Sequence, residues 1–375
     1  MATATLTEAR LQLRSCIQKV ATGPEYSKDL SLDEAREAMA TILRGEADPV
    51  QTAILLIAMR MKRETDDENR GVLRALIDAA EITTAAVDEV VDLADPYDGW
   101  SRGLPATPFL PAVLAACGVA TVSHGLEAVG PKFGITHRKV LRAAGAAVDS
   151  DRDAVANALA DGNQGWAYID QHEFCKPLHD LVPLRTTMVK RTVLTTVEVL
   201  LGPVRGRKQT HLVTGYVHKA YPPIYASLAR EAGFDTAAII RGVEGGIIPS
   251  LQQEAKVFAY HARGAEQEHC ITPTEIGIES DTRATPLPTD LPKASAGDNR
   301  ASDFDCDAAA ERAAENGLAA LDGKPGPARD SLIYGGAIVL HHLRRADDMV
   351  SAARLVRDVL DNGAARARFQ AACNK

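Results

Sequence analysis

Basic side chains are concentrated in one segment of the chain, residues 185–219. Its seven Lys and Arg residues stand against a single acidic residue, Glu198, for a local charge of +6. They are Arg185, Lys190, Arg191, Arg205, Arg207, Lys208 and Lys219, and a second cluster holds Lys132, Arg138, Lys139 and Arg142. Such residues favour binding to the phosphates of a nucleic acid, because each neutralised phosphate releases counterions. A solvated face, or ion pairs with acidic helices, would give the same composition.

Two further groups of residues have types that could do chemistry. Asp95, Asp98 and Glu244 fall where a cleft is expected, and a carboxylate there could act as a base or a ligand, although surface solvation explains it as well. His172, Cys175 and His179 have a spacing that one helix could gather around zinc. We favour a structural role for them, because lone His and Cys residues usually pack or cap, and we predict no metal site.

The first ninety residues contain clear helix start signals. Ser31-x-x-Glu34 and Thr65-x-x-Glu68 are capping boxes, and Asp48-Pro49 is an N-cap followed by a first-turn proline. Each signal precedes apolar residues at helical spacing. We therefore predict a small, all-helical N-terminal domain.

From about residue 90 the pattern changes to short β-rich runs that alternate with alanine-rich helical ones. The predicted strands cover residues 90–94, 119–123, 212–217, 237–241 and 256–260, with a helix near 221–232. This alternation is typical of an α/β domain with a mainly parallel central sheet flanked by helices. Ligands of such sheets bind beyond the carboxyl ends of the strands, which here are followed by the loops 95–106, 124–138 and 242–250.

Composition excludes several other classes of protein. The chain has 375 residues, 46% of them apolar, a net charge of −8 and six cysteines without a CxxC pair. These values exclude a disordered tail and a disulfide miniprotein. The longest apolar run, residues 112–122, is too short to span a bilayer, and charged residues interrupt the first twenty positions. We expect a cytoplasmic protein that makes no membrane contact.

Motifs along nearly the whole chain resemble the anthranilate phosphoribosyltransferases of glycosyltransferase family 3. They lie at residues 30–39, 57–65, 115–118, 123–125, 182–185, 200–203 and 326–330. The resemblance implies a small helical domain over residues 1–87 and a large α/β domain over 88–375, a fold shared with the pyrimidine nucleoside phosphorylases. It also implies a homodimer built on the helical domain, with a contribution from about 172–200.

The chain departs from that family where the substrate motifs should be. The family's Gly-Thr-Gly-Gly-Asp pyrophosphate loop here reads Asp-Pro-Tyr-Asp-Gly over 95–99, and Pro96 removes an amide donor. Glu127 replaces an arginine. The family's magnesium-binding Asp-Glu pair matches Ile247 and Ile248, and isoleucine cannot ligate a cation. The resemblance therefore predicts a protein without a magnesium cofactor, and it assigns no catalytic residue.

Other positions keep the family's pattern. The resemblance places Arg185 at an anthranilate carboxylate, and His124 with Gly125 at an aromatic ligand. The ligand cleft that it implies comprises Asp98, Gly99, Thr107, His124, Gly125, Lys132, Arg185 and Glu244.

This mixture is similar to a diverged branch of the family whose members are nucleic-acid-binding dimers. Our leading hypothesis is a protein that binds phosphate-rich ligands, such as single-stranded DNA or RNA, in a basic cleft or dimer groove. The candidate contacts are Arg138, Lys139, Lys190, Arg191, Arg205, Arg207 and Lys208. The alternative is an active phosphoribosyltransferase or nucleoside phosphorylase that acts on a ribosyl phosphate, with Arg185 as the anchor.

Overall fold

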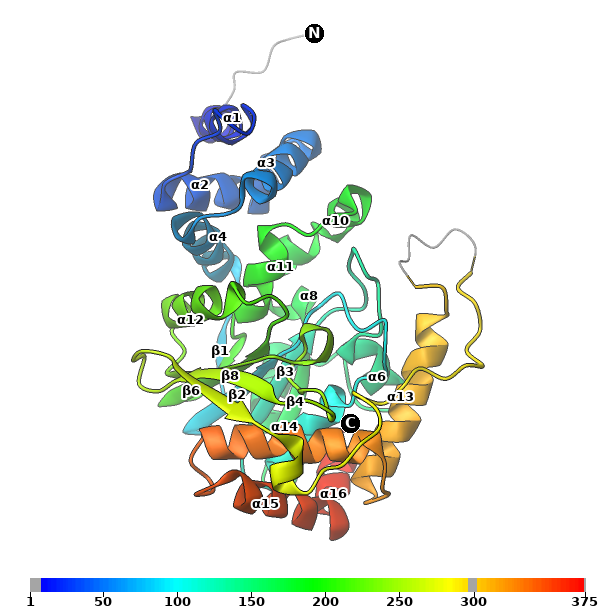
Figure 1. Ribbon diagram of the computed structural model, residues 1–375. Helices are drawn as coiled ribbons and strands as arrows, with labels where there is room; N and C mark the ends of the chain where they lie inside the picture. The colour runs from blue at the N-terminus through cyan, green and yellow to red at the C-terminus, as the bar shows by residue number, and fades with distance from the viewer. Residues whose placement is uncertain (1–7, 296–301, 374–375) are drawn as a thin grey trace.

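Four helices form a bundle at the N-terminal end of the computed structural model, which describes residues 8–295 and 302–373 (Figure 1). They are α1 (Glu8–Val20), α2 (Leu32–Leu43), α3 (Pro49–Lys62) and α4 (Asp66–Ala79). Ser31 and Thr65 each form a complete capping box, and the Asp48 carboxylate accepts from the first free amides of α3. The predicted starts of α2, α3 and α4 are thus confirmed.

A seven-stranded sheet forms the centre of the large domain, in the order β4-β3-β2-β6-β7-β8-β9. The strands are β2 (Glu89–Ala94), β3 (Thr121–Gly125), β4 (Trp166–Asp170), β6 (Gln209–Gly215), β7 (Thr236–Ile240), β8 (Ala255–Tyr260) and β9 (Gln267–Ile271). The first five run parallel, and β8 and β9 are antiparallel to their neighbours. The five predicted strands are present with shifted ends, whereas β4 and β9 were not predicted.

Both faces of the sheet are buried, as expected for parallel strands covered by helices. Alternate residues of β2 enter different cores: Val91 and Leu93 face one, and Val90 and Ala94 face the other. The first core is closed by α5 (Leu110–Ala116), α6 (His137–Ala143), α13 (Cys306–Leu321), α14 (Pro327–His342), α15 (Met349–Asp361) and α16 (Ala364–Cys373). The second is closed by α7 (Arg152–Ala160), α12 (Tyr221–Glu231) and the bundle. In Figure 1, α12 and the bundle lie on the opposite side of the sheet from α14–α16.

The segment between β4 and β6 returns to the bundle. It contains α8 (Gln171–Phe174), α9 (Lys176–His179), α10 (Val182–Met188) and α11 (Val193–Val197). Helices α10 and α11 contact α3, and α11 and α12 contact α4. Two ion pairs, from Arg70 and Arg74 to Glu231, join α4 to α12. The bundle is therefore attached to the large domain on one flank.

The observed architecture is a small helical domain beside a large α/β domain with a mostly parallel sheet, which confirms the expected fold class. None of the helices within residues 8–295 and 302–373 combines the length and the apolar character that crossing a membrane requires.

Candidate functional site

A cavity of about 790 Å³ opens beside the carboxyl ends of β2 and β6. The chain places β3 and β4 on one side of β2 and then crosses over to β6 on the other, so this point is where the strand order reverses. Such a switch point is the usual ligand site of an open α/β sheet. Ala94, at the end of β2, and Thr214 and Gly215, at the end of β6, form part of its wall, and the bundle contributes Arg60.

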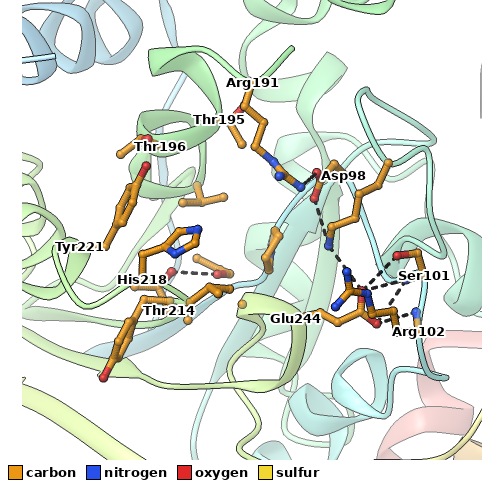
Figure 2. A pocket seen from close by; sticks show the side chains of 18 of the residues that line it. Asp98, Ser101, Arg102, Arg191, Thr195, Thr196, Thr214, His218, Tyr221 and Glu244 are labelled. Atoms are coloured by element: carbon orange, nitrogen blue, oxygen red, sulfur yellow. Dashed lines mark hydrogen bonds and ion pairs between the residues drawn. The ribbon is translucent and has the colours of Figure 1, made fainter. Parts of the chain in front are cut away.

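Charged side chains line one end of the cavity. Asp98 is buried and forms ion pairs with Arg191 and with Lys132, whose Nζ lies 3.6 Å from its Oδ1 (Figure 2). Lys132 Nζ also donates to the carbonyl of Gly99 at 2.8 Å. The lining contains four Arg and Lys residues, namely Arg60, Arg102, Lys132 and Arg191, against the three carboxylates of Asp98, Glu244 and Asp303. An anionic ligand is therefore favoured over a cationic one.

Glu244 binds the loop that follows β2. Its carboxylate accepts from the backbone N–H of Arg102 at 2.7 Å and of Ser101 at 3.0 Å, and from the Ser101 hydroxyl at 3.2 Å (Figure 2). It lies in the 3-10 helix Val243–Gly245 with φ 56° and ψ 15°, a left-handed conformation that is uncommon outside glycine. The amides of this loop are thus satisfied by a side chain of the protein itself.

The other end of the cavity carries hydroxyl groups and rings. Thr192, Thr195 and Thr196 line it, together with His218, Tyr221 and Tyr225. Arg60 Nη1 donates to the Tyr221 hydroxyl at 3.2 Å and lies 3.3 Å from Glu64. Burial raises the pKa of the Tyr225 phenol well above its usual range, so this ring is a neutral hydrogen-bonding group. Hydroxyls and aromatic faces suit a sugar or a ring better than a phosphate group.

The structure brings together some of the predicted cleft residues. Asp98, Lys132 and Glu244 line the cavity, and so does Arg191, which the sequence assigned to nucleic-acid binding. Gly99 has φ 74°, and a Cβ on it would lie 2.8 Å from the backbone of Gly134, so its role is close packing of two loops. Thr107 is fully buried at the start of the 3-10 helix Thr107–Phe109.

His124 lies in a buried row of hydrogen bonds. Its Nε2 lies 2.7 Å from Asp92 Oδ1, and its Nδ1 bonds the hydroxyl of Tyr97. All three side chains are almost fully buried, and Gly125 is buried beside Tyr168. These residues of β2 and β3 therefore stabilise the loop after β2 from within, and neither His124 nor Gly125 is among the residues that line the cavity.

Arg185 forms a buried ion pair. Both of its terminal nitrogens donate to Glu198, at 2.7 Å each, and the two side chains are only 5% and 1% exposed. Glu198 also accepts from Gln171 Nε2 at 3.3 Å. The carboxylate that Arg185 binds is thus an internal one, and Arg185 is not among the residues that line the cavity.

The remaining basic candidates do not share one groove. Arg138 pairs with Glu127, Asp149 and Asp170, and Lys139 pairs with Glu127 and Asp307. Arg205 lies over the ring of Phe234 and donates to two backbone carbonyls, and burial lowers its pKa. Lys208 pairs with Asp88, and Arg207 is exposed beside it.

The position of β6 separates these cations. Arg205, Arg207 and Lys208 precede its first residue, whereas the cavity lies at its last. Seven residues of strand span roughly 20 Å, so these side chains lie near the amino ends of the strands, whereas Arg191 and its neighbour Lys190 lie near the carboxyl ends. Within one subunit these cations therefore do not line a single cleft.

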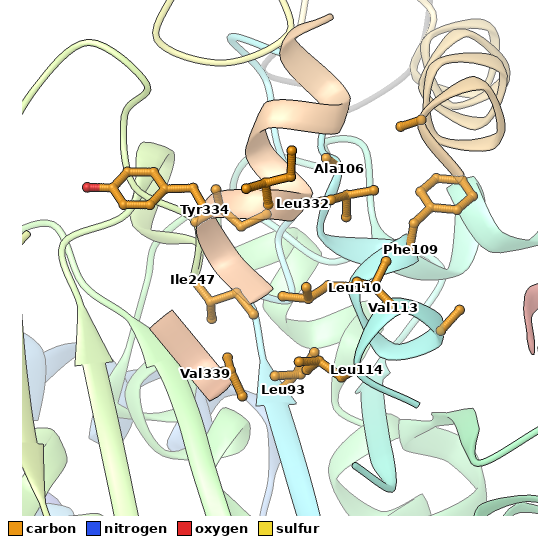
Figure 3. Close-up of a cluster of buried hydrophobic side chains, with 14 of the residues drawn as sticks. Leu93, Ala106, Phe109, Leu110, Val113, Leu114, Ile247, Leu332, Tyr334 and Val339 are labelled. Atoms are coloured by element: carbon orange, nitrogen blue, oxygen red, sulfur yellow. The ribbon is translucent and has the colours of Figure 1, made fainter. Parts of the chain in front are cut away.

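The residues present do not fit a magnesium ion at the family position. Ile247 and Ile248 are buried, and Figure 3 shows Ile247 among Leu93, Leu332 and Val339 of the core. The Ile247 N–H donates to Asp95 Oδ1 at 2.8 Å, and Asp95 also bonds His137. Across residues 8–295 and 302–373, no group of three or more His, Cys, Asp or Glu residues is placed to hold a metal ion.

The two histidines and the cysteine of the 172–179 segment have surroundings that fit a structural role. Cys175 is buried, which raises the pKa of its thiol to about 11, and a protonated thiol is a poor metal ligand. The rings of His172 and His179 lie edge to face at 5.2 Å.

Sequence reasoning missed the hydroxyl and aromatic end of the cavity. Arg60 belongs to the 57–65 motif that carries the family resemblance, so this motif was the available signal for it. Tyr221 and Tyr225 lie one turn apart on α12, a spacing as typical of core as of a binding wall. Tertiary packing alone brings them opposite Arg60.

Two family models match the chain. The helical bundle domain of a glycosyl transferase family matches residues 14–80, and the a/b domain of a glycosyl transferase family matches residues 107–366. The second match alone covers more than half of the chain.

Individual relatives agree with these matches. The chain is 27% identical over 359 residues to the anthranilate phosphoribosyltransferase of Rhodopseudomonas palustris strain BisA53, covering 96% of both proteins. Its fold is similar to that of the Thermus thermophilus enzyme of the same name, with a TM-score of 0.73 and 20% identity over 96% of this chain and 98% of that one. It is also similar to the Saccharomyces cerevisiae enzyme in complex with PRPP and Mg, with a TM-score of 0.75 and 14% identity over 97% of both chains.

Proposed function

The chain belongs to the glycosyl transferase family that joins a helical bundle to an a/b domain, and we propose that it binds a phosphorylated ribosyl ligand in its cavity without magnesium. We further propose that it is a diverged member that does not make phosphoribosyl anthranilate at a useful rate. The class of ligand is taken from the yeast relative, which was solved with PRPP and Mg.

One observation carries the proposal: four cationic side chains line the cavity against three carboxylates. Asp98 is held by Arg191 and Lys132, and Glu244 is held by two backbone amides. Arg and Lys are the side chains that recognise phosphate by charge-assisted hydrogen bonds. The hydroxyls of Thr195, Thr196 and Tyr221 offer partners for the sugar.

Calorimetric titration with ribose 5-phosphate tests this assignment. We expect Arg191→Ala to weaken binding by roughly tenfold, because one charge-assisted contact is lost. Arg207→Ala is the matched control, since it removes the same side chain at the opposite edge of the sheet and should leave the affinity unchanged. Equal effects of the two substitutions would contradict the proposal.

Single-stranded nucleic acid is a second candidate ligand, favoured by exposed cations that flank the cavity. Lys190 precedes Arg191 of the lining, Lys219 follows His218, and both lysines are exposed. A plot of the logarithm of the affinity against the logarithm of the salt concentration should have a slope of about −0.7 per phosphate neutralised. The anisotropy of a labelled oligonucleotide, measured across salt concentrations, gives this slope. The double variant Lys190→Ala with Lys219→Ala should have a shallower slope, and an unchanged slope would exclude this candidate.

We also propose a homodimer formed through the bundle. On α3 the side chains of Val50, Ile54 and Met61 are 65%, 43% and 78% exposed and lie on one face of the helix. Val189, at the end of the neighbouring α10, is 63% exposed. A row of exposed apolar side chains is typical of a surface that another subunit covers.

A further inference from the structure

The donors around Glu244 form an anion-binding site. They comprise two successive backbone N–H groups, from Ser101 and Arg102, and the Ser101 hydroxyl, with Lys132 Nζ 3.7 Å from the carboxylate. Successive amides beside an ammonium group are the donors that proteins use for phosphate oxygens. The site lies in the cavity wall, and the protein's own carboxylate fills it.

We infer that Glu244 is a specificity-determining residue that occupies the phosphate position of the cavity and excludes small inorganic anions from it. The inference rests on the proposed function of the same cavity. An incoming phosphate must take the amides from a carboxylate that is covalently attached nearby, and it then meets the negative charge of that carboxylate. A bare anion gains nothing else to offset this competition.

A larger ligand is affected differently. A ribosyl phosphate also contacts the hydroxyl and aromatic end of the cavity, around Thr195 and Tyr221, and these contacts offset the displacement of the carboxylate. The backbone around Glu244 is closely packed at Gly242 and Gly246, so the displacement that we infer is a rotation about the side-chain bonds of Glu244. Glu244 thus favours ligands that carry a sugar over phosphate or pyrophosphate alone.

The backbone at Glu244 supports a role beyond packing. The left-handed conformation brings a Cβ close to a carbonyl oxygen, whereas glycine or asparagine adopts it readily. Glu244 adopts it nonetheless, and its carboxylate makes three hydrogen bonds to one loop.

Titration of the full chain with inorganic pyrophosphate tests the inference. We expect Glu244→Ala to bind pyrophosphate roughly tenfold or more tightly than the unaltered protein, because the two amides and the Ser101 hydroxyl lose the carboxylate that they now bind. Asp303→Ala is the matched control: it removes one negative charge from the same cavity lining, and Asp303 makes none of the hydrogen bonds to Ser101 or Arg102. It should change the affinity by less than about threefold.

Each outcome decides something different. The inference is supported if Glu244→Ala gains more affinity for pyrophosphate than Asp303→Ala does. This holds even if ribose 5-phosphate fails to bind, a result that would refute the proposed ligand class. Equal gains, with ribose 5-phosphate still bound, overturn the inference and leave the proposed function standing. Absence of pyrophosphate binding in every variant overturns the inference, and absence of ribose 5-phosphate binding as well overturns both. Glu244→Asn, which suits the left-handed backbone, decides the matter if circular dichroism shows that the alanine variant is unfolded.

Discussion

Replacement of Arg185 by methionine should destabilise the fold without acting on the ligand. The substitution removes the cation from a pair whose members are 5% and 1% exposed, and it leaves Glu198 as a buried charge with one remaining hydrogen bond, from Gln171. Loss of one partner from a buried ion pair costs about 3–5 kcal/mol, because the other charge is left without compensation. Urea denaturation followed by circular dichroism measures this loss.

The double variant Arg185→Met with Glu198→Gln separates burial of a charge from loss of packing. Glutamine keeps an acceptor for Gln171 and removes the negative charge, so most of the lost stability should return. A ligand-binding Arg185, as the family resemblance implies, would give the opposite pattern. In that case the single variant would lose less than about 1 kcal/mol of stability but would lose ligand affinity, and that result would refute our account of Arg185.

Two further predictions concern pH and assembly. Burial lowers the pKa of His342 to about 3 from an ordinary value near 6.5, so its neutral form contributes stability above pH 6.5 that is lost as the pH falls toward 3, by up to about 1.4 kcal/mol per pH unit. Urea midpoints between pH 7 and pH 4 should therefore fall more steeply for the unaltered protein than for His342→Gln, and parallel curves would contradict this. Ile54→Glu combined with Met61→Glu should convert a dimer into monomers, because two charges enter the apolar face of α3; light scattering that gives the 40.0 kDa monomer mass for the unaltered protein would remove the dimer from the account.

Local signals in the sequence predicted the elements well, because each signal acts within a few residues. The capping boxes at Ser31 and Thr65 start helices in the structure, since the hydrogen bonds involved join positions three apart. Strand β4 was missed because its five residues, Trp166–Asp170, lead directly into a helix and show no clear alternation.

The basic residues were harder to interpret from the sequence, because a count of charges does not show what each charge faces. Arg185 lies only six residues before Arg191, yet its side chain is turned inward onto Glu198. Arg205 lies four residues before the start of β6, and its side chain is turned inward onto the ring of Phe234. Their partners lie 13 and 29 residues away along the chain, so only the fold reveals them.

The site itself could be predicted in outline. The loops 95–106, 124–138 and 242–250 were expected to hold the ligand, and they contribute Asp98, Lys132 and Glu244 to the cavity. The loop after β6 also lines the cavity and was not predicted to do so. Its aromatic end, which depends on how α12 and α3 face each other, was not predicted, because side-chain spacing within one helix carries no information about its neighbour.

Calorimetric titration with phosphoribosyl pyrophosphate, in magnesium and again in excess EDTA, tests the central claim most directly. Ile247 and Ile248 are buried and leave no carboxylate pair at the family's metal position. We therefore predict an affinity that differs by less than about threefold between the two conditions, or less than about 0.7 kcal/mol. Micromolar binding that appears only with magnesium would contradict the account.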